Sequence, residues 1–363
     1  MKICIVISTI SSGGAERNAC LLANHFSKKN NVEIFTYQKT KKSFYNLSRR
    51  ISVKNLNLLV KNENFIFRFI NFFKRLFIIY RNLKKEKPEV LISFLETTNI
   101  TVLIASMFIN EIKLKIVSDR NNPKYSEKKK ILYLLKSIFY RFSNFLVLQT
   151  KKIKENYKFI ESSKIKIIPN TLSKNIFIKK KNDVIKDLKI ISVGRLEYQK
   201  GYKILLQALC ILVKKKIKFK CDIFGQGSER KYIQNYININ KLNKYVKLKG
   251  VTRDILKMYK NYNLYILSSF FEGCPNSLLE AQSSGLTCIS SNCDYGPSEI
   301  IINNENGLLF KNGDATDLSK KILFLIKNKK KFKIFSNNSK KKFEIEQYNR
   351  DKIKKWEELI KIK

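Results

Sequence analysis

The chain has few acidic residues and almost no histidine. Its 363 residues contain 29 aspartates and glutamates against 73 lysines and arginines, which gives a formal net charge of +44, and a single histidine. The seven cysteines form no Cys-x-x-Cys pair and no cluster with histidine, which argues against a structural zinc site and favours a reducing, cytoplasmic compartment. No apolar run reaches the roughly eighteen residues that a membrane span needs, so we expect a soluble or peripheral protein.

Length and composition indicate a globular protein with two domains. Single hydrophobic cores rarely grow beyond about 250–300 residues, and 44% of this longer chain is hydrophobic. Only 12 of the basic residues are arginine, whereas proteins that recognise DNA bases or bind phosphates through two hydrogen bonds favour the planar arginine side chain. Because the lysines are spread along the chain and form no recognisable nucleic-acid module, we expect no specific nucleic-acid partner. A basic nucleic-acid-binding protein is the alternative from another class.

Short apolar runs alternate with longer helical patterns, which is typical of βαβ units around parallel sheets. A first series of strands is expected at Lys2–Ser8, Val32–Thr36, Val90–Ser93, Leu114–Ser118, Phe145–Leu148 and Lys166–Ile168. A second series is expected at Leu188–Val193, Phe219–Phe224, Lys244–Leu248, Leu264–Leu267 and Thr287–Ser290. The predicted fold class is α/β, with two Rossmann-like, doubly wound lobes facing a central cleft. The domains are 1–172 and 188–345, joined by a linker at 173–187, with a last helix at 346–363.

Three glycine turns follow predicted strands, where exposed N–H groups can bind an anion. Gly13 and Gly14 precede a helical run at Asn18–Lys28, and Gly225 follows a strand of the second lobe. The second lobe opens with Gly194-Arg195-Leu196-Glu197-Tyr198-Gln199-Lys200-Gly201, a loop that can bring Arg195 and Lys200 to one phosphate pair. The alternative is that the glycines are ordinary tight turns and both cations are solvated.

Two carboxylates lie on either side of a predicted helix start. They belong to residues 251–300, which hold three basic and five acidic residues and so lack the excess of lysine found elsewhere in the chain. Glu272 lies in the loop before Pro275, and Glu280 lies a turn or more inside the helix. Carboxylates suit sugar and ribose hydroxyls, whereas the N–H groups at 274–278 suit phosphate. The alternative is that Glu272 caps the helix and Glu280 faces solvent.

With these pieces in order, the chain resembles the GT-B enzymes of glycosyltransferase family 4, which are retaining and use nucleotide-activated sugars. The resemblance covers nearly the whole chain. It rests on Gly13-Gly14-Ala15-Glu16-Arg17, Gly-Arg…Lys-Gly at 194–201, Gly225 and Gly227, Glu-x7-Glu at 272–280, Ser284-Gly285-Leu286, Gly296-Pro297-Ser298-Glu299-Ile300-Ile301 and Asn306-Gly307-Leu308-Leu309.

The resemblance implies a role for each matching residue. Arg195 and Lys200 would grip the donor diphosphate as catalytic cations, and Glu272 would contact the donor sugar. The implied donor-binding residues are Gly14, Arg120, Gly225, Val251, Asn276, Ser277, Leu278 and Glu280, with Glu280 on the ribose hydroxyls and Val251 facing the base. No Asp-x-Asp occurs, consistent with relatives that need no metal, so no cofactor is expected besides the nucleotide-sugar co-substrate. The last helix is expected to cross back to the first domain, as in GT-B proteins.

One loop departs from the family pattern. Many relatives carry a functional histidine after a late strand of the first lobe, where this chain has Ser118-Asp119-Arg120-Asn121-Asn122-Pro123. Arg120 would take that loop's role toward the donor, as in relatives with Glu-Arg-Asn that often transfer N-acetylhexosamines. The sole histidine, His25, is expected to be a surface or packing residue.

Residues 65–87 form a basic helix with an aromatic stripe. Phe65, Phe69, Phe72, Phe73, Leu76, Tyr80 and Leu83 recur at helical spacing, and the basic residues among them are Arg68, Lys74, Arg75, Arg81, Lys84 and Lys85. Such a helix can lie in an anionic leaflet, and acceptors in this family are often lipid-linked. The alternative, that this stripe packs on the first-lobe sheet, is favoured for the stripe itself. Apolar residues outside the stripe then require a second partner, and we expect this partner to be the membrane. These residues are Ile66, Ile70 and Phe77 beside the stripe, and Phe67 and Ile78 opposite it.

The sequence therefore predicts a retaining glycosyltransferase. It would move a hexose or N-acetylhexosamine from a nucleotide-sugar, with UDP as the expected nucleotide, to a glycan or lipid-linked acceptor without a metal. We expect it in the cytoplasm, peripheral on the inner face of the membrane. A non-catalytic relative with the same fold is the second alternative. The presence of Arg195, Lys200, Glu272 and Glu280 together argues against this alternative. The overall drift of the composition toward lysine, isoleucine and asparagine does not explain why all four are present.

Overall fold

The computed structural model divides the chain into two compact units. It describes residues 1–11, 13–38, 43–58, 65–120, 130–172, 187–252, 254–342 and 345–361, and for 65–69 and 345–347 the backbone alone. The first unit comprises Met1–Thr171 and Asp351–Lys363, and the second comprises Leu172–Arg350. The linker expected at 173–187 lies, except for its last residue, outside the described residues.

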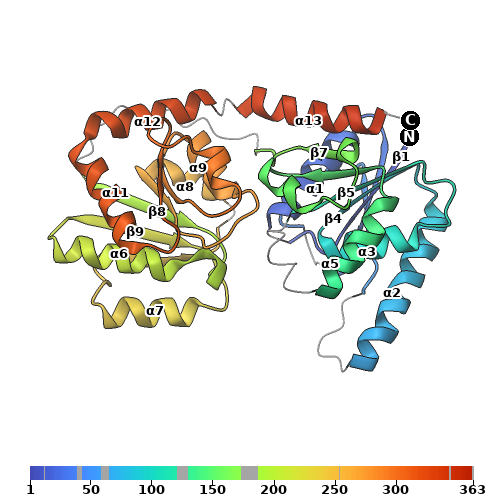
Figure 1. The fold of residues 1–363 in the computed structure, drawn as a ribbon, viewed down its shortest axis with the longest axis horizontal. Helices are drawn as coiled ribbons and strands as arrows, with labels where there is room; N and C mark the ends of the chain where they lie inside the picture. Colours follow the sequence, from blue (N-terminus) through green and yellow to red (C-terminus); the bar gives the residue numbers. More distant parts are fainter. Residues whose placement is uncertain are drawn as a thin grey trace. The chain divides into compact units, whose positions relative to one another are not determined.

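The first unit is built around a parallel sheet of seven strands (Figure 1). The strands are β1 (Lys2–Ile7), β2 (Asn31–Thr36), β3 (Ile51–Asn55), β4 (Val90–Phe94), β5 (Leu114–Ser118), β6 (Phe145–Leu148) and β7 (Ile165–Ile167), in the order β3-β2-β1-β4-β5-β6-β7. The order reverses beside β1, as in a doubly wound sheet. The helices are α1 (Gly14–Phe26), α2 (Phe65–Glu86), α3 (Glu96–Ala105), α5 (Lys130–Phe139) and the part of α13 (Ile345–Lys361) from Asp351 onward.

The last helix contributes to the core of the first unit. Trp356, Leu359 and Ile360 of α13 lie in one buried cluster with residues of β1 and α1, and the Trp356 ring lies 6.3 Å from that of Phe94. His25 of α1 lies 2.8 Å from the Glu357 carboxylate. The sole histidine is therefore a packing residue that helps to fasten α13.

Helix α2 packs on the core with part of the expected stripe, because Leu83 is buried and Leu76 and Tyr80 pack against the same cluster. Ile79 and Leu83 are fully buried, and Ile78, which was expected on the opposite side, packs against the same cluster. Phe73, expected in the packing stripe, is instead 52% exposed, and Ile70 and Phe77 are exposed as well. At about 100° per residue, Ile70 and Phe77 project away from a face centred on Ile79. The prediction for Phe73 and Ile78 was wrong.

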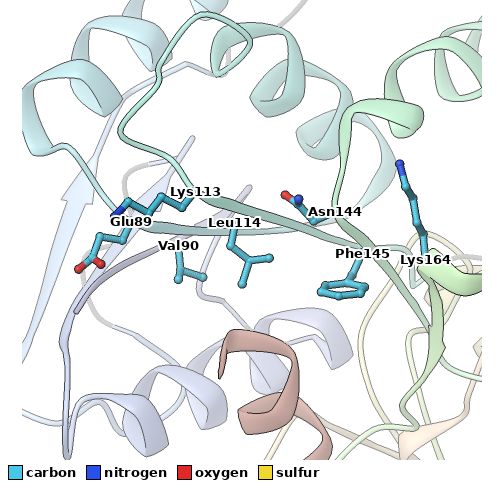
Figure 2. Close-up of a pocket in the computed structure, with 7 residues that line it drawn as sticks. All are labelled: Glu89, Val90, Lys113, Leu114, Asn144, Phe145 and Lys164. Atoms are coloured by element: carbon cyan, nitrogen blue, oxygen red, sulfur yellow. The ribbon is translucent and has the colours of Figure 1, made fainter. Parts of the chain in front are cut away.

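A pocket of about 340 Å³ lies at the amino-terminal edge of the first sheet (Figure 2). It is lined by residues that begin or immediately precede β4, β5, β6 and β7: Glu89, Val90, Lys113, Leu114, Asn144, Phe145 and Lys164. Ligands of doubly wound sheets bind beyond the opposite, carboxyl-terminal edge. The pocket therefore belongs to a different surface from the candidate site residues of this unit.

The second unit repeats the architecture with six parallel strands. They are β8 (Leu188–Val193), β9 (Phe219–Phe224), β10 (Val246–Gly250), β11 (Leu264–Leu267), β12 (Thr287–Ser291) and β13 (Leu308–Phe310), in the order β10-β9-β8-β11-β12-β13. The helices are α6 (Tyr202–Lys214), α7 (Arg230–Ile239), α8 (Ile255–Met258), α9 (Asn276–Ser283), α10 (Pro297–Ile300), α11 (Ala315–Lys327) and α12 (Lys329–Lys342). The prediction of two Rossmann-like α/β domains is confirmed.

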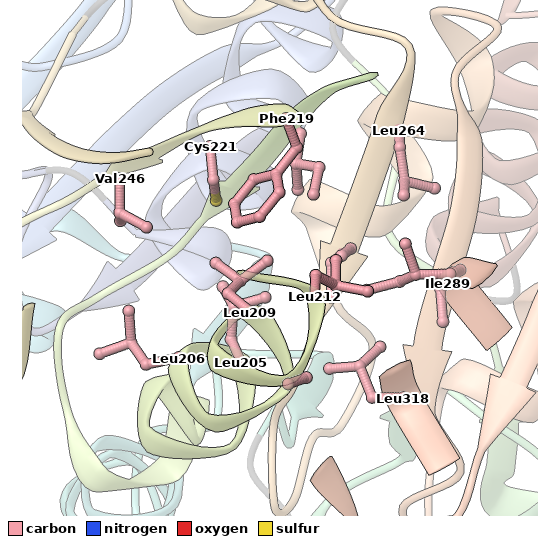
Figure 3. Close-up of a cluster of buried hydrophobic side chains, with 14 of the residues drawn as sticks. Leu205, Leu206, Leu209, Leu212, Phe219, Cys221, Val246, Leu264, Ile289 and Leu318 are labelled. Atoms are coloured by element: carbon pink, nitrogen blue, oxygen red, sulfur yellow. The ribbon is translucent and has the colours of Figure 1, made fainter. Parts of the chain in front are cut away.

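Leucines of α6 form the centre of the second core (Figure 3). Leu205, Leu209 and Leu212 recur at intervals of three and four, so they share one face of the helix, and each is fully buried. They pack with Phe219 of β9 and Leu318 of α11 in one cluster. This packing fixes the amino terminus of α6, which follows the Arg195–Lys200 loop.

Candidate functional site

Lys200 and Glu272 form a mostly buried ion pair in the second unit. The Lys200 Nζ lies 2.6 Å from the Glu272 Oε1, and the two side chains are 13% and 7% exposed. Lys200 ends the short 3-10 turn Tyr198–Lys200 before α6, whereas Glu272 lies in the loop after β11. Two segments that are distant in sequence therefore meet through opposite charges at the carboxyl-terminal edge of one sheet. The alternative of a solvated Lys200 is wrong.

Further hydrogen bonds join these two segments. The Phe270 N–H donates to the Gln199 carbonyl over 2.8 Å, and the Gln199 side-chain amide donates to the Phe271 carbonyl over 2.9 Å. The Ser268 hydroxyl donates to the Lys200 carbonyl over 2.9 Å. The segment at 199–200 and the one at 268–272 thus form one continuous surface.

Gly201 permits this close approach. Its φ is +57°, in the left-handed region, and a Cβ there would lie 2.2 Å from the Ser268 carbonyl oxygen. Gly225 is similarly constrained, since its φ is +147° and a Cβ would lie 1.8 Å from the Gly194 carbonyl oxygen. The structural role of Gly225 is therefore to pack its turn against the start of the Arg195 loop.

Glu272 and Arg195 each have a polar partner that holds the side chain. The Ser269 hydroxyl donates to the same Oε1 of Glu272 over 2.6 Å. The exposed Arg195 donates from Nη2 to the Gln199 Oε1 over 3.2 Å. Gln199 thus connects the arginine to the loop that carries Glu272. A lone glutamine or serine in a loop gives no sequence signal, so neither was predicted.

Helix α9 begins directly after the Glu272 loop. Asn276, Ser277 and Leu278 form its first turn after Pro275, and the Tyr265 hydroxyl donates to the Ser277 Oγ over 2.7 Å. Glu280 is 8% exposed, and the Tyr259 hydroxyl lies 3.4 Å from its Oε2. The alternative that Glu280 faces solvent is therefore wrong. Val251, after β10, is half exposed.

In the first unit, Gly14 is the exposed first residue of α1. The helix was expected to start at Asn18, so this boundary was wrong by a full turn. Asn18 donates from its side chain to the Gly14 carbonyl over 3.3 Å, which supports the early turn. The glycine pair that was predicted to form a turn before the helix therefore forms the start of the helix itself.

Arg120 is buried among groups that follow β5, β6 and β7. Its Nε donates to the Ser118 Oγ over 2.8 Å, its guanidinium lies 5.3 Å from the centre of the Phe94 ring, and its Nη1 donates to the Asn170 Oδ1. The same oxygen accepts from Asn18 and Gln149, each over 2.7 Å. These amides were not predicted, because only the sheet topology brings them to Arg120.

Asp119, the residue before Arg120, belongs to a buried network of charged side chains. The Lys136 Nζ of α5 lies 2.9 Å from the Asp119 Oδ2 and 2.8 Å from the Glu96 Oε1. The Tyr157 hydroxyl donates to the same Asp119 oxygen over 2.6 Å. Burial alone would lower the pKa of Lys136, but the two carboxylates more than offset it and raise the pKa. Burial, with Asp119 adding to it, raises the pKa of Tyr157 far above its usual range. Lys136 therefore stays protonated and Tyr157 neutral at physiological pH.

Within the described ranges, no group of three or more histidine, cysteine, aspartate or glutamate side chains is arranged to hold a metal ion. Similarly, no helix in the described part of the chain is long and apolar enough to cross a membrane.

Comparisons with known proteins identify the enzyme class. The family model described as glycosyl transferases group 1 matches residues 173–342. The chain is 30% identical over 362 residues, 98% of each chain, to the Campylobacter jejuni GalNAc-alpha-(1->4)-GalNAc-alpha-(1->3)-diNAcBac-PP-undecaprenol alpha-1,4-N-acetyl-D-galactosaminyltransferase. A solved mutant of S. aureus TarM has a TM-score of 0.79 at 15% identity over 99% of each chain. Anabaena HepE has a TM-score of 0.77 at 16% identity, over 98% of this chain and 99% of its own.

The solved structures share the fold, and the Campylobacter jejuni enzyme shares the sequence over almost the whole chain. A non-catalytic role is thereby disfavoured. The chain is a glycosyltransferase and belongs to the glycosyl transferases group 1 family.

Proposed function

We propose that this enzyme is a retaining glycosyltransferase of family 4. It transfers a hexose or N-acetylhexosamine from a UDP-sugar to a glycan or lipid-linked saccharide. The observation that carries the proposal is the Lys200–Glu272 pair beside Arg195, since it sets a fixed carboxylate next to cations at a ligand-binding edge of the sheet. Similar proteins support the proposed substrates, because the Campylobacter jejuni relative is named for an undecaprenol-linked acceptor and HepE was solved with UDP and glucose.

Arg195 and the first turn of α9 are proposed to bind the donor diphosphate. An arginine can donate two parallel hydrogen bonds to phosphate, and the positive end of a helix dipole, here at Asn276, Ser277 and Leu278, favours an anion. Stabilisation of the leaving nucleotide by fixed donors is usually the largest catalytic term. These groups would supply the charge that a divalent ion supplies in other transferases, so transfer is proposed to need no metal.

Glu272 is proposed to hold the donor sugar, and Lys200 to hold Glu272. Lys200 and Ser269 both donate to Oε1, so the other carboxylate oxygen is aimed by a fixed side chain. Glu280, a buried residue in the second turn of α9, is proposed to bind the ribose hydroxyls, with Val251 and Gly225 near the nucleotide. Gly14 and Arg120 of the first unit are proposed as further donor contacts.

Retention is proposed to follow from front-side attack. The acceptor hydroxyl would lose its proton toward the departing phosphate, on the same side of the sugar ring. This route needs no strong protein base, and the only histidine is engaged with Glu357.

Arg195→Ala tests the diphosphate assignment. We expect it to weaken UDP binding about ten- to a hundredfold, because a charge-assisted bidentate contact contributes roughly 1.5–3 kcal/mol. Titration calorimetry with UDP measures the change. Lys203→Ala, which removes an exposed cation of α6, is the matched control and should bind UDP normally. Equal affinities for the two variants would contradict the assignment.

Gln199→Leu tests the link between Arg195 and the Glu272 loop. Removing the amide frees Arg195 and breaks the bond to the Phe271 carbonyl, so the KM for the donor should rise by about tenfold. Steady-state kinetics with varied donor check this result. Gln234→Leu on helix α7 is the control, and an unchanged KM for Gln199→Leu would show that the link is irrelevant to the donor.

Attachment to an anionic membrane surface through 65–87 is also proposed, on the cytoplasmic side. Ile70, Phe73 and Phe77 of α2 are exposed, and Lys74, Arg81 and Lys84 share the exposed side of the helix. Apolar side chains flanked by cations suit the headgroup region of an anionic leaflet.

A further inference from the structure

Helix α5 carries an exposed apolar stripe along its whole length. Ile131, Leu134, Ile138 and the following Phe142 are 76%, 57%, 45% and 48% exposed. Their spacing of three, four and four residues keeps them on one side of the helix. The opposite side holds Lys136, which is buried against Asp119 and Glu96. The orientation of α5 is thus fixed from within, and the stripe cannot turn inward without exposing that ion network.

The stripe of α5 and the exposed stripe of α2 belong to one layer of helices. Helix α3 packs against both α2 and α5, and Figure 1 shows α3 between them. Helix α3 is itself almost completely buried, and Thr97 is its one exposed residue. Helices α2 and α5 therefore form the two exposed ridges of this layer, each with aliphatic and aromatic side chains on the outside.

The charges around both ridges have one sign. Lys74, Arg81 and Lys84 are exposed on α2, and Lys130 and Arg141 are exposed at the two ends of the α5 stripe. In the described parts of these helices the one acidic residue is Glu86, which is partly buried on the core-facing side of α2 and paired with Lys2 and Lys54. A second copy of this surface would be repelled, whereas an anionic leaflet would be attracted.

We infer that α5 is a second lipid-binding helix and that the α5 stripe enters the interface of an anionic membrane together with α2. This inference rests on the membrane attachment proposed above for α2. One helix leaves a peripheral protein free to rotate about the contact, whereas two ridges on either side of α3 define a plane.

The topology links this plane to the candidate site. Helices that precede parallel strands run opposite to them, so α2 before β4 and α5 before β6 both begin at the carboxyl-terminal edge of the sheet. Gly14 and Arg120 lie at that same edge, after β1 and β5. Contact through both ridges would hold this edge at a constant distance from the leaflet, where the saccharide of a lipid-linked acceptor is presented.

Vesicle co-sedimentation of the full chain tests the inference. The vesicles contain phosphatidylethanolamine and phosphatidylglycerol, and phosphatidylcholine vesicles serve as the uncharged comparison. The α5 variant, Leu134→Ser with Ile138→Ser, should bind anionic vesicles at least about tenfold more weakly, because two apolar side chains no longer enter the interface. The α2 variant, Phe73→Ser with Phe77→Ser, should lose a similar amount. Ile239→Ser, at a highly exposed isoleucine of α7, should bind like the parent protein.

Transfer to a soluble, lipid-free acceptor separates the possible failures. All four proteins should keep this activity, because the substituted side chains are exposed and outside the candidate site. If the α5 variant binds anionic vesicles as the parent does, the inference about α5 is wrong, whatever the α2 variant does. If the parent protein binds neither type of vesicle, membrane attachment is wrong as a whole, while soluble transfer still stands.

Discussion

Glu272→Gln should lower kcat/KM at least about a hundredfold while the protein stays folded. The amide still accepts from Ser269, so the loop after β11 keeps its hydrogen bond. It cannot carry the charge that Lys200 faces over 2.6 Å or that a donor-sugar hydroxyl would meet. Removing one fixed polar group from a transition-state contact costs about 10²–10³ in rate. Steady-state transfer with a soluble acceptor measures the loss.

Two further variants separate chemistry from stability. Glu305→Gln, at an exposed glutamate of the same unit, should retain the parent rate and unfolding midpoint. Lys200→Ala should lose activity as Glu272→Gln does, because the carboxylate is no longer held. The double variant, Lys200→Met with Glu272→Gln, should be more stable than the sum of the single changes predicts, since neither charge is left without its partner. Parent-level transfer by Glu272→Gln would contradict the site assignment.

Lys136→Met should destabilise the first unit by about 3–5 kcal/mol, because breaking a buried ion pair leaves uncompensated charge. Lys136 is 2% exposed and faces Asp119 and Glu96 over less than 3 Å. Methionine fills the space without the charge. Urea unfolding monitored by circular dichroism measures the shift.

Lys130→Met on the same helix is the matched control. The Lys130 side chain is exposed, so the free energy of unfolding should change by less than about 0.5 kcal/mol in this variant. Adding Asp119→Asn to Lys136→Met should restore part of the loss, because a buried charge disappears with its partner. If Lys136→Met and Lys130→Met unfold at the same urea concentration, the network does not stabilise this unit.

The two parallel sheets could be predicted because central strands are short and continuously apolar. The expected strands at Leu114–Ser118, Phe145–Leu148, Leu188–Val193, Phe219–Phe224 and Leu264–Leu267 agree with the structure residue for residue. Strands β3 and β13 were missed. The first is a mostly exposed edge strand with polar residues. The second is apolar, but its three residues are too few to show a strand period.

The site could be predicted only where residue type and position after a strand coincide. Glu272 was expected in a loop and Glu280 inside a helix, and both lie there. The ion pair with Lys200 was not expected, because both cations of that loop were assigned to phosphate. Lys136 was missed for a compositional reason, since one buried lysine among so many has no distinguishing sequence signal. The exposed face of α2 depended on which side packs on the core, and the helical period alone cannot decide that.

Turnover of a nucleotide-sugar panel is the most direct test of the proposed function. The full chain is incubated with UDP- and GDP-linked hexoses and N-acetylhexosamines in a metal chelator, and thermal stability and sugar release are measured for each donor. We expect a UDP-sugar to raise the unfolding temperature and to be slowly hydrolysed, with the anomeric configuration retained on transfer to an acceptor. The proposed function would be contradicted if no UDP-sugar stabilises the protein, or if turnover appears only when a divalent metal is restored.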